Sequence, residues 1–347
     1  MCDQWNAQQL DEALSPLPRP ARSGAAALVL GGTFGRARTL AVDAKGRVLA
    51  YGYGRGATTD IAVCPGGRRL AELMSLEPGV AVAVRDARSL ELIRQRRIRL
   101  PGDRFVSRFV PYGVVPGFPG RYGLACEDPA ASRLLVFATD QGAPPRARLI
   151  RLAGRTTETL WRGIARFASF ALPTVYLNTG AAAPRLVAFH VRTRRATFVS
   201  RLPRDTFPLV PSPDGRQLAG IVFNAPERGS SPRSRLVVVD LRGADPELRT
   251  APLGATFVAG EAHWLPDGRL IFFPSTGNDT IRIYDQRLRL RSGYRRWSAY
   301  ETAIVGSTAY GLEPGGRLTA VQVPTSELRF SRRLPSPVVL ALTPASR

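Results

Sequence analysis

Short apolar runs on both sides of a turn recur along this chain, and they predict β-hairpins. The clearest examples are PSPDGRQL (211–218) and WLPDGRLI (264–271), where Gly supplies the positive φ of a tight hairpin and Pro and Asp favour the start of the turn. Four further turns follow the pattern with decreasing strength: LEPGGRLT (312–319), CPGGRRL (64–70), PGFPGRYG (116–123) and the glycine-free ALPTVYLN (171–178). The six turns are about fifty residues apart, which indicates one repeated supersecondary unit.

A second predicted hairpin follows several of these turns, so each unit has four strands. The second hairpins are GVAVAVRDARSLEL (79–92), RLVVVDLRGADPEL (235–248) and TIRIYDQRLRL (280–290). The run from Val80 to Val84 is apolar at every position, so both faces of that strand are expected to be covered by neighbouring sheets. The pattern predicts an all-β fold, a β-propeller of four-stranded antiparallel blades.

The number of blades depends on how one extra hairpin is interpreted. Six turns favour six blades, but the hairpin at 37–54 has its turn at Gly46, about twenty residues before the next turn, and this is too short for a blade. We interpret it as outer strands that join the last blade, whose C-terminal part (318–343) lacks a clear second hairpin. This arrangement would pair both chain ends and close the ring. If the hairpin is an independent first blade, the count becomes seven.

Length and composition are consistent with one propeller domain. A chain of 347 residues exceeds the size of most single-core domains, yet no linker divides it, and its 33 Gly and 29 Pro are spread over its whole length. We therefore predict a single propeller over residues 24–347, preceded by an N-terminal extension or tether over residues 1–23.

Two stretches resemble known propeller repeats. PDGRLIFFPSTGNDTIRIYDQ (266–286) resembles an NHL-type repeat, with Gly277 and Asn278 in the G-N element and Tyr284 and Asp285 ending the outer strand. SPDGRQLAGIVFNAPERGSSPRSRLVVVDL, which begins at Ser212, is similar to the PD-type repeats of bacterial TolB-like periplasmic propellers. The resemblance covers about 90 residues of the chain (211–300). It implies a six-bladed propeller that acts as a ligand-binding or interaction platform, although some relatives are lactonases or other hydrolases.

The enzymatic alternative requires polar side chains near the propeller axis. His263 lies on a predicted innermost strand, two residues after Glu261, and these two residues are the catalytic candidates. Asn178, Asn224 and Asn278 follow strands of different predicted blades and are candidate ligand-binding residues that could converge. The resemblance to lactonases implies oxygen ligands around a central divalent ion, so calcium in the central channel is the candidate cofactor. Asn also caps turns through its own side chain, and a histidine on an inner strand can be purely structural.

The formal charge of +22 comes from 49 Lys and Arg against 27 Asp and Glu, and suggests an anionic partner such as nucleic acid or acidic lipid. Arginine clusters occur at 94–99, 192–195, 287–297 and 331–333, on the predicted outer strands. The best local case is 287–300, where Arg295 and Trp297 are candidates for phosphate contact and base stacking. Charge on outer strands also blocks edge pairing, and a coding bias for arginine would produce the same excess.

The cysteines and the N-terminus suggest little about location. Cys2, Cys64 and Cys126 are odd in number and lack metal-ligand spacing, so we predict neither a disulfide framework nor a zinc site, and expect Cys64 and Cys126 to be small buried residues. No signal peptide or transmembrane segment is evident, which predicts a cytoplasmic protein. The alternative is an exported lipoprotein anchored at Cys2 after removal of its signal.

The sequence thus predicts a non-enzymatic binding or interaction platform for an unidentified protein or small molecule. A metal-assisted, lactonase-like hydrolase at the propeller mouth is the first alternative. Polyanion binding through the arginine-rich perimeter is the second.

Overall fold

A computed structural model describes residues 19–344 of the chain, apart from a series of mostly short stretches. The stretches that it leaves out are 22–23, 35–36, 55–56, 76–79, 99–121, 140–144, 181–182, 207–208, 225–232, 244, 254–259, 275–279, 297–298, 300, 314–315, 324, 326 and 335–337. Most of the predicted extension (1–23) and the predicted turn near Gly117 lie outside the described residues.

The regular elements of the described residues are antiparallel β-strands, which group into sheets in chain order. Sheet A contains β27 (Val338–Pro344), β1 (Ala26–Phe34), β2 (Ala37–Asp43) and β3 (Val48–Tyr53), and sheet B contains β4 (Ala57–Val63), β5 (Arg69–Ser75), β6 (Val80–Asp86) and β7 (Leu92–Ile98). Sheet E contains β15 (Val210–Pro211), β16 (Gln217–Asn224), β17 (Arg233–Asp240) and β18 (Glu247–Pro252). Sheet F contains β19 (Gly260–Trp264), β20 (Leu270–Pro274), β21 (Thr280–Tyr284) and β22 (Leu290–Arg296), and sheet G contains β23 (Glu301–Val305), β24 (Thr308–Glu313), β25 (Arg317–Gln322) and β26 (Leu328–Arg333).

Between sheets B and E, seven strands form one continuous sheet because a single long strand belongs to two units. The strands are β8 (Tyr122–Cys126), β9 (Arg133–Thr139), β10 (Arg146–Ala153), β11 (Thr156–Ala171), β12 (Thr174–Thr179), β13 (Arg185–His190) and β14 (Arg195–Arg201). The first part of β11, up to Ile164, pairs with β10, and the remainder, from Ala165, pairs with β12. We call the two halves sheet C (β8–β11) and sheet D (β11–β14).

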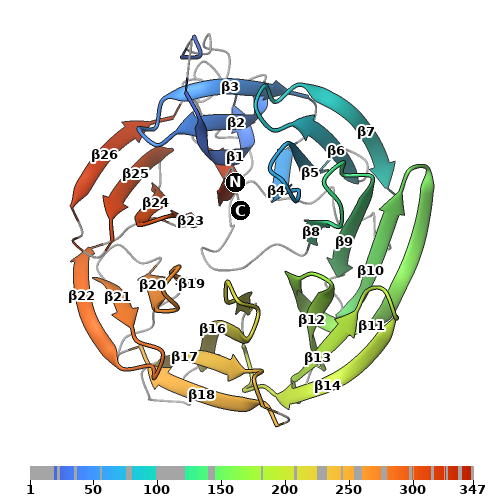
Figure 1. Ribbon diagram of the computed structural model, residues 1–347, viewed down its shortest axis with the longest axis vertical. Coiled ribbons are helices and arrows are strands. Elements are labelled where there is room, and N and C mark those ends of the chain that lie inside the picture. Colours follow the sequence, from blue (N-terminus) through green and yellow to red (C-terminus); the bar gives the residue numbers. More distant parts are fainter. Residues whose placement is uncertain are drawn as a thin grey trace, which may run out of the picture.

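The sheets are arranged around a common centre (Figure 1). Strands such as β4, β8, β19 and β23 lie towards the centre, which we call the inner rim, whereas β7, β14, β18 and β22 lie at the perimeter. Neighbouring sheets pack through buried apolar clusters, which join A to B, B to C, C to D, D to E, E to F, F to G and G to A.

Strand β6 shows why a strand can begin with an unbroken apolar run, here Val80 to Val84. Val80, Val82 and Val84 pack in the cluster between sheets B and C, whereas Ala81 and Ala83 lie on the opposite face with Met74. Because successive side chains point to opposite faces, an uninterrupted apolar run fits a strand that is covered on both sides, as predicted.

Where the predicted glycine turns lie in the described residues, turn chemistry predicted a hairpin correctly, but it did not always predict which two strands of a unit the hairpin joins. Gly67, Gly215, Gly268 and Gly316 all have the positive φ expected of turn glycines. However, Gly316 ends the turn between β24 and β25, the second and third strands of sheet G, while the first turn of that sheet is at Gly306. A glycine turn marks any tight hairpin, so it does not specify which two strands of a unit it joins.

The N-terminal hairpin lies in a different sheet from the one expected. β25 and β26 complete sheet G with β23 and β24, so the last predicted blade has its own four strands. Of the described C-terminal strands β25, β26 and β27, β27 alone joins the N-terminal strands: it pairs with β1 and forms sheet A with β1, β2 and β3. The first and last described strands of the chain are therefore neighbours, but in a sheet of their own.

The described residues contain no helix that is long and apolar enough to cross a membrane.

Candidate functional site

The inner strand β19 presents two titratable side chains on one face. Ala262 and Trp264 face the core shared by sheets E and F, and the Trp264 indole N–H donates to the carbonyl of Val210 at 2.8 Å. Glu261 and His263 alternate with them and therefore point to the opposite face, as expected for successive residues of a strand. The buried Trp264 side chain therefore determines which face of β19 Glu261 and His263 occupy.

Glu261 and His263 form a pair that is anchored to the next sheet. His263 Nε2 lies 3.1 Å from Glu261 Oε2, and the same oxygen accepts a hydrogen bond of 3.1 Å from the backbone N–H of Thr302 on β23. The His263 ring also meets the Phe273 ring edge to face, with centroids 5.8 Å apart. The side chains remain partly exposed, 31% for Glu261 and 23% for His263, so both are accessible to a ligand.

The tautomer of His263 follows from its partner. A carboxylate only accepts hydrogen bonds, so Nε2 facing Glu261 carries the proton, and neutral His263 then offers Nδ1 as an acceptor. When His263 is neutral, the pair therefore presents Nδ1 as an acceptor, and the second carboxylate oxygen of Glu261, Oε1, has no hydrogen bond among the described residues. Such groups bind hydroxyl or amine donors, and a histidine oriented by a carboxylate can also act as a general base.

Gly260 at the start of β19 is required for this geometry, and this gives a first prediction. A Cβ at residue 260 would collide with the carbonyl oxygen of Phe273 and would lie 2.8 Å from Cε2 of Phe272. We expect Gly260→Ala to separate β19 from β20 and to destabilise the fold by about 1–3 kcal/mol, as overpacking does. Thermal unfolding measures the effect.

The matched control is Gly243→Ala, because the nearest heavy atom to a Cβ there is 3.4 Å away. Equal melting temperatures for the two variants would contradict the close approach of β19 and β20.

The asparagine candidates are not seen to join this pair. Asn178 lies on β12, where its side-chain amide donates to the carbonyl of Thr206 at 3.0 Å, and its Oδ1 is buried with no partner in the described structure. Asn224 is the last residue of β16 and pairs with Arg233, and its side chain is outside the described atoms. Asn278 and Trp297 are outside the described residues. Their roles in ligand binding stay predictions.

No described cluster of three or more His, Cys, Asp or Glu side chains is arranged to hold a metal ion. Glu261 is the described candidate that offers an available carboxylate oxygen, which is the kind of ligand that calcium takes. Further oxygen ligands would have to come from residues such as Asn224 and Asn278, so calcium at the centre also stays a prediction.

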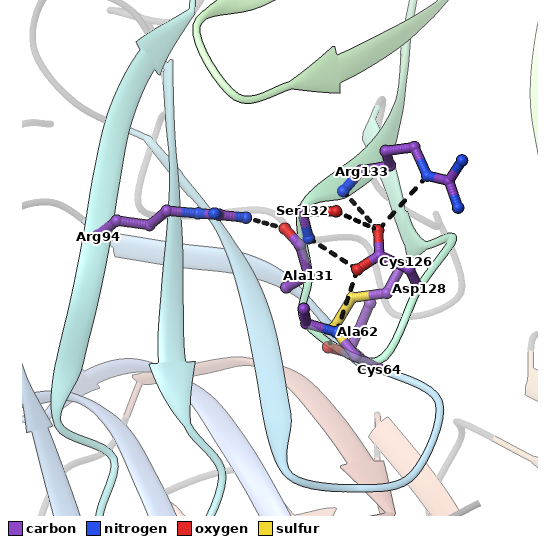
Figure 2. Close-up of a disulfide and its surroundings, with 9 residues drawn as sticks. Ala62, Cys64, Arg94, Cys126, Asp128, Ala131, Ser132 and Arg133 are labelled. Carbon is purple, nitrogen blue, oxygen red and sulfur yellow. Dashed lines mark hydrogen bonds and ion pairs between the residues drawn. A yellow bond between two sulfur atoms is a disulfide. The ribbon is translucent and has the colours of Figure 1, made fainter.

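The structure contains a disulfide between Cys64 and Cys126, which corrects the prediction of two unpaired thiols (Figure 2). Cys64 directly follows β4 and Cys126 ends β8, so the bond joins the inner strands of sheets B and C, with the Cα atoms 5.0 Å apart. Both residues are buried, as predicted. The sequence contained an indication of the pairing, because each cysteine comes immediately before or at the first turn of its unit.

Hydrogen bonds fix the turn that follows Cys126. Asp128 accepts from the backbone N–H groups of Ala130, Ser132 and Arg133 and from the Ser132 hydroxyl. Burial raises the pKa of the Asp128 carboxyl, but these hydrogen bonds outweigh it, so the net pKa lies below the usual value. Ala131 takes the positive φ, 56°, that glycine takes in other first turns, and the Asp128 carboxylate holds the turn around it.

The arginine clusters lie mainly on perimeter strands, as predicted. Residues 94–98 belong to β7, 192–195 to the β13–β14 hairpin, 287–296 to the β21–β22 hairpin and β22, and 331–333 to β26. Arg295 lies on β22, and its side chain is outside the described atoms. Arg291 is exposed and pairs with Asp285 at 2.7 Å. A continuous basic face over 287–296 stays a prediction.

Comparison with known proteins shows the fold. No family model matches the chain, and no curated protein matches it. Among solved structures, hydrazine synthase from Kuenenia stuttgartiensis is similar with a TM-score of 0.62 and 13% identity, covering 89% of this chain and 99% of that chain. Periplasmic gluconolactonase from Pseudomonas aeruginosa is similar with a TM-score of 0.61 and 12% identity, and the match covers 91% of this chain and 98% of that chain. The Swd1 β-propeller domain of Myceliophteria thermophila is similar with a TM-score of 0.53 and 12% identity, and the match covers 80% of this chain and 87% of that chain. The chain therefore has a β-propeller fold. At sequence identities this low, the function of these proteins cannot be transferred to this chain.

Proposed function

We propose that this chain is a non-enzymatic binding platform that holds a polar ligand at the inner rim, beside Glu261 and His263. The observation that carries the proposal is the partly exposed pair on β19, whose 3.1 Å hydrogen bond and link to Thr302 hold its acceptors in one orientation. Preorganised polar groups in a partly buried setting are typical of ligand sites. The complementary ligand is a small polyol or sugar-like molecule that donates hydroxyl groups.

We also infer seven blades instead of six. Counting sheets C and D as two blades that share β11 gives seven four-stranded units, A to G. Each unit has an apolar cluster with the next, including G with A, which supports a ring in which the chain ends meet within sheet A. This arrangement corresponds to the seven-blade alternative of the sequence.

Binding is favoured over catalysis by the contacts of the pair. In the described structure, no hydroxyl or thiol is hydrogen-bonded to His263, whereas nucleophilic catalysis requires a nucleophile within about 2.6–3.2 Å of its base. Glu261 Oε2 already accepts two hydrogen bonds, which supports a structural and recognition role for this residue.

A hydrolase is the second candidate because the geometry of the same pair is also compatible with base catalysis. A glutamate that orients a histidine can activate a water molecule directly, without a protein nucleophile. The similar fold of a periplasmic gluconolactonase makes a lactone a sensible test substrate. In this case Glu261 would orient His263, and calcium, if bound, would polarise the lactone carbonyl.

One experiment separates the two candidates. Wild type, Glu261→Gln and His263→Ala are each tested for thermal stabilisation by glucose, gluconate and glucono-1,5-lactone, and for lactone hydrolysis with calcium or EDTA. The platform predicts that at least one probe raises the melting temperature of wild type but not of Glu261→Gln, without turnover. The surface variant Glu327→Gln is the control and should behave as wild type, because Glu327 is exposed. Turnover that Glu261→Gln abolishes would replace the platform with the hydrolase.

We further propose that the chain folds in an oxidising compartment, which corresponds to the exported alternative. The Cys64–Cys126 disulfide supports this location, because structural disulfides persist outside the reducing cytosol. Alkylation of thiols in intact cells, followed by mass analysis, tests it: Cys64 and Cys126 should be unmodified until the protein is reduced.

A further inference from the structure

A groove of about 550 Å³ lies at the perimeter between sheets B and C, away from the inner rim. Its floor is apolar and consists of Val82 and Val84 from β6, Leu134 from β9 and Leu152 from β10. Its walls carry Arg94 and Arg96 from β7 and Arg155 from the β10–β11 turn. The volume is within the range of about 300–1,000 Å³ that is typical of small-molecule sites.

Two arginines of sheet B reach across to sheet C and lie beside the groove. Arg94 donates to the carbonyl of Ala131 (Figure 2). Arg96 donates to three carbonyls of the β10–β11 turn, those of Gly154 at 3.0 Å, Arg155 at 2.6 Å and Thr156 at 2.8 Å. These acceptors are neutral, so they position the guanidinium groups without neutralising their charge. Both cations are thus held in fixed places beside an apolar surface.

The positive charge of the groove has no counter-charge within it. Arg155 is exposed, and the described structure shows no ion pair for its side chain, while none of the residues that line the groove is acidic. The nearby acid Asp128 hydrogen-bonds to the lining residue Ser132, but it also pairs with Arg133 and accepts backbone hydrogen bonds. Three arginines therefore surround the groove with no acid to compensate them.

We infer that this groove binds a monoanionic amphiphile, a carboxylate attached to a single alkyl chain. The alkyl chain would lie on the valine and leucine floor. The carboxylate would accept hydrogen bonds from Arg155 and from N–H groups of Arg94 other than the one that donates to Ala131. Charge-assisted hydrogen bonds of this kind are roughly twice as strong as neutral ones. A short groove with an apolar floor suits a small amphiphile, whereas a polyanion needs an extended basic track.

Isothermal titration calorimetry with octanoate tests the inference, with 1-octanol and acetate as probes that lack the charge or the chain. We expect saturable one-to-one binding of octanoate, binding of octanol that is at least tenfold weaker, and no saturable heat with acetate. Arg155→Glu, in an exposed turn where folding is not at risk, should weaken octanoate binding about tenfold or more, in line with the loss of a hydrogen bond between charged groups.

The matched variant is Arg332→Glu on perimeter strand β26, which makes the same charge change on an exposed residue outside the groove. It should leave octanoate affinity within about twofold of wild type, because exposed charges more than a Debye length of about 10 Å apart are screened at 0.1 M salt. Glu261→Gln should also leave it unchanged, since the groove is separate from the inner rim.

Four results would each overturn the inference. Absence of saturable octanoate binding would mean that the groove is not a ligand site. Equal affinity for acetate, or equal weakening by Arg332→Glu, would mean that binding reflects net charge. Equal affinity for octanol would mean that the arginines do not recognise the head group.

Discussion

Loss of the Cys64–Cys126 disulfide is expected to lower the stability of the propeller by about 4 kcal/mol. The bond closes a loop with a sequence separation of 62 residues, and a cross-link of this span removes about 14 cal/mol/K of entropy from the unfolded chain. If the 347 residues unfold as one unit, the melting temperature should fall by about 5–6 °C. Differential scanning calorimetry of Cys64→Ser, Cys126→Ser and the double variant measures the effect.

The position of the bond explains why the effect should be large. It joins inner strands of neighbouring sheets at the buried junction of B and C (Figure 2). Its loss therefore loosens the contact between two units and also increases the conformational entropy of the unfolded chain. The control is Cys2→Ser, which should leave the melting temperature unchanged. In denaturant, the oxidised protein should have one reactive thiol, that of Cys2. Three reactive thiols before reduction, or equal melting temperatures with and without a reducing agent, would disprove the bond.

The fold was largely predictable because its signals are local. The turns at Gly215 and Gly268, with apolar runs on either side, require hairpins by their own backbone conformation. The assignment of strands to units was less predictable. β11 looks like one strand in sequence but serves sheets C and D, and β27 crosses to β1 at the other end of the chain. Pairing between distant strands depends on packing that no local pattern contains.

In the candidate site, too, local features were predictable and contacts between sheets were not. Glu261 and His263 became candidates because they are two residues apart on a predicted inner strand, and the structure confirms that they lie on that strand. The hydrogen bond that Glu261 accepts from the backbone N–H of Thr302 joins neighbouring sheets, as do the disulfide and the contacts of Arg96 with the β10–β11 turn. Such contacts form only when separate units pack together, so single-sequence patterns did not reveal them.

Removal of Arg85 is the second change expected to have a large effect. Arg85 and Glu72 form an ion pair at the junction of sheets A and B, with Nε 2.8 Å from Oε2 and exposures of 1% and 0%. The guanidinium also donates to the carbonyls of Leu90 at 3.0 Å and Tyr53 at 2.8 Å. Arg85→Met would leave Glu72 buried without a counter-charge, and breaking such a pair costs about 3–5 kcal/mol.

The pH dependence of this loss has a definite sign. Burial raises the pKa of Glu72 above its model-compound value of 4.5, and Arg85 opposes that rise. Without Arg85 the folded-state pKa rises further, so the folded variant binds a proton more tightly than the unfolded chain does. Its stability should therefore decrease as pH rises from about 4.5 through the folded-state pKa, and the deficit relative to wild type should be larger at pH 8 than at pH 5. Chemical denaturation at the two pH values measures the difference.

A matched exposed pair and a double variant show whether the cost arises from a buried charge. Arg69 and Asp86 form an ion pair on neighbouring strands of the same sheet, but their side chains are 36% and 35% exposed. Arg69→Met should therefore cost no more than about 1 kcal/mol. Glu72→Leu combined with Arg85→Met removes both charges and should recover most of the lost stability, because apolar replacements of a buried pair are often neutral. If the double variant is as unstable as Arg85→Met alone, the cost comes from lost packing and from the Leu90 and Tyr53 carbonyls that lose their donor, and the unpaired charge of Glu72 does not explain it.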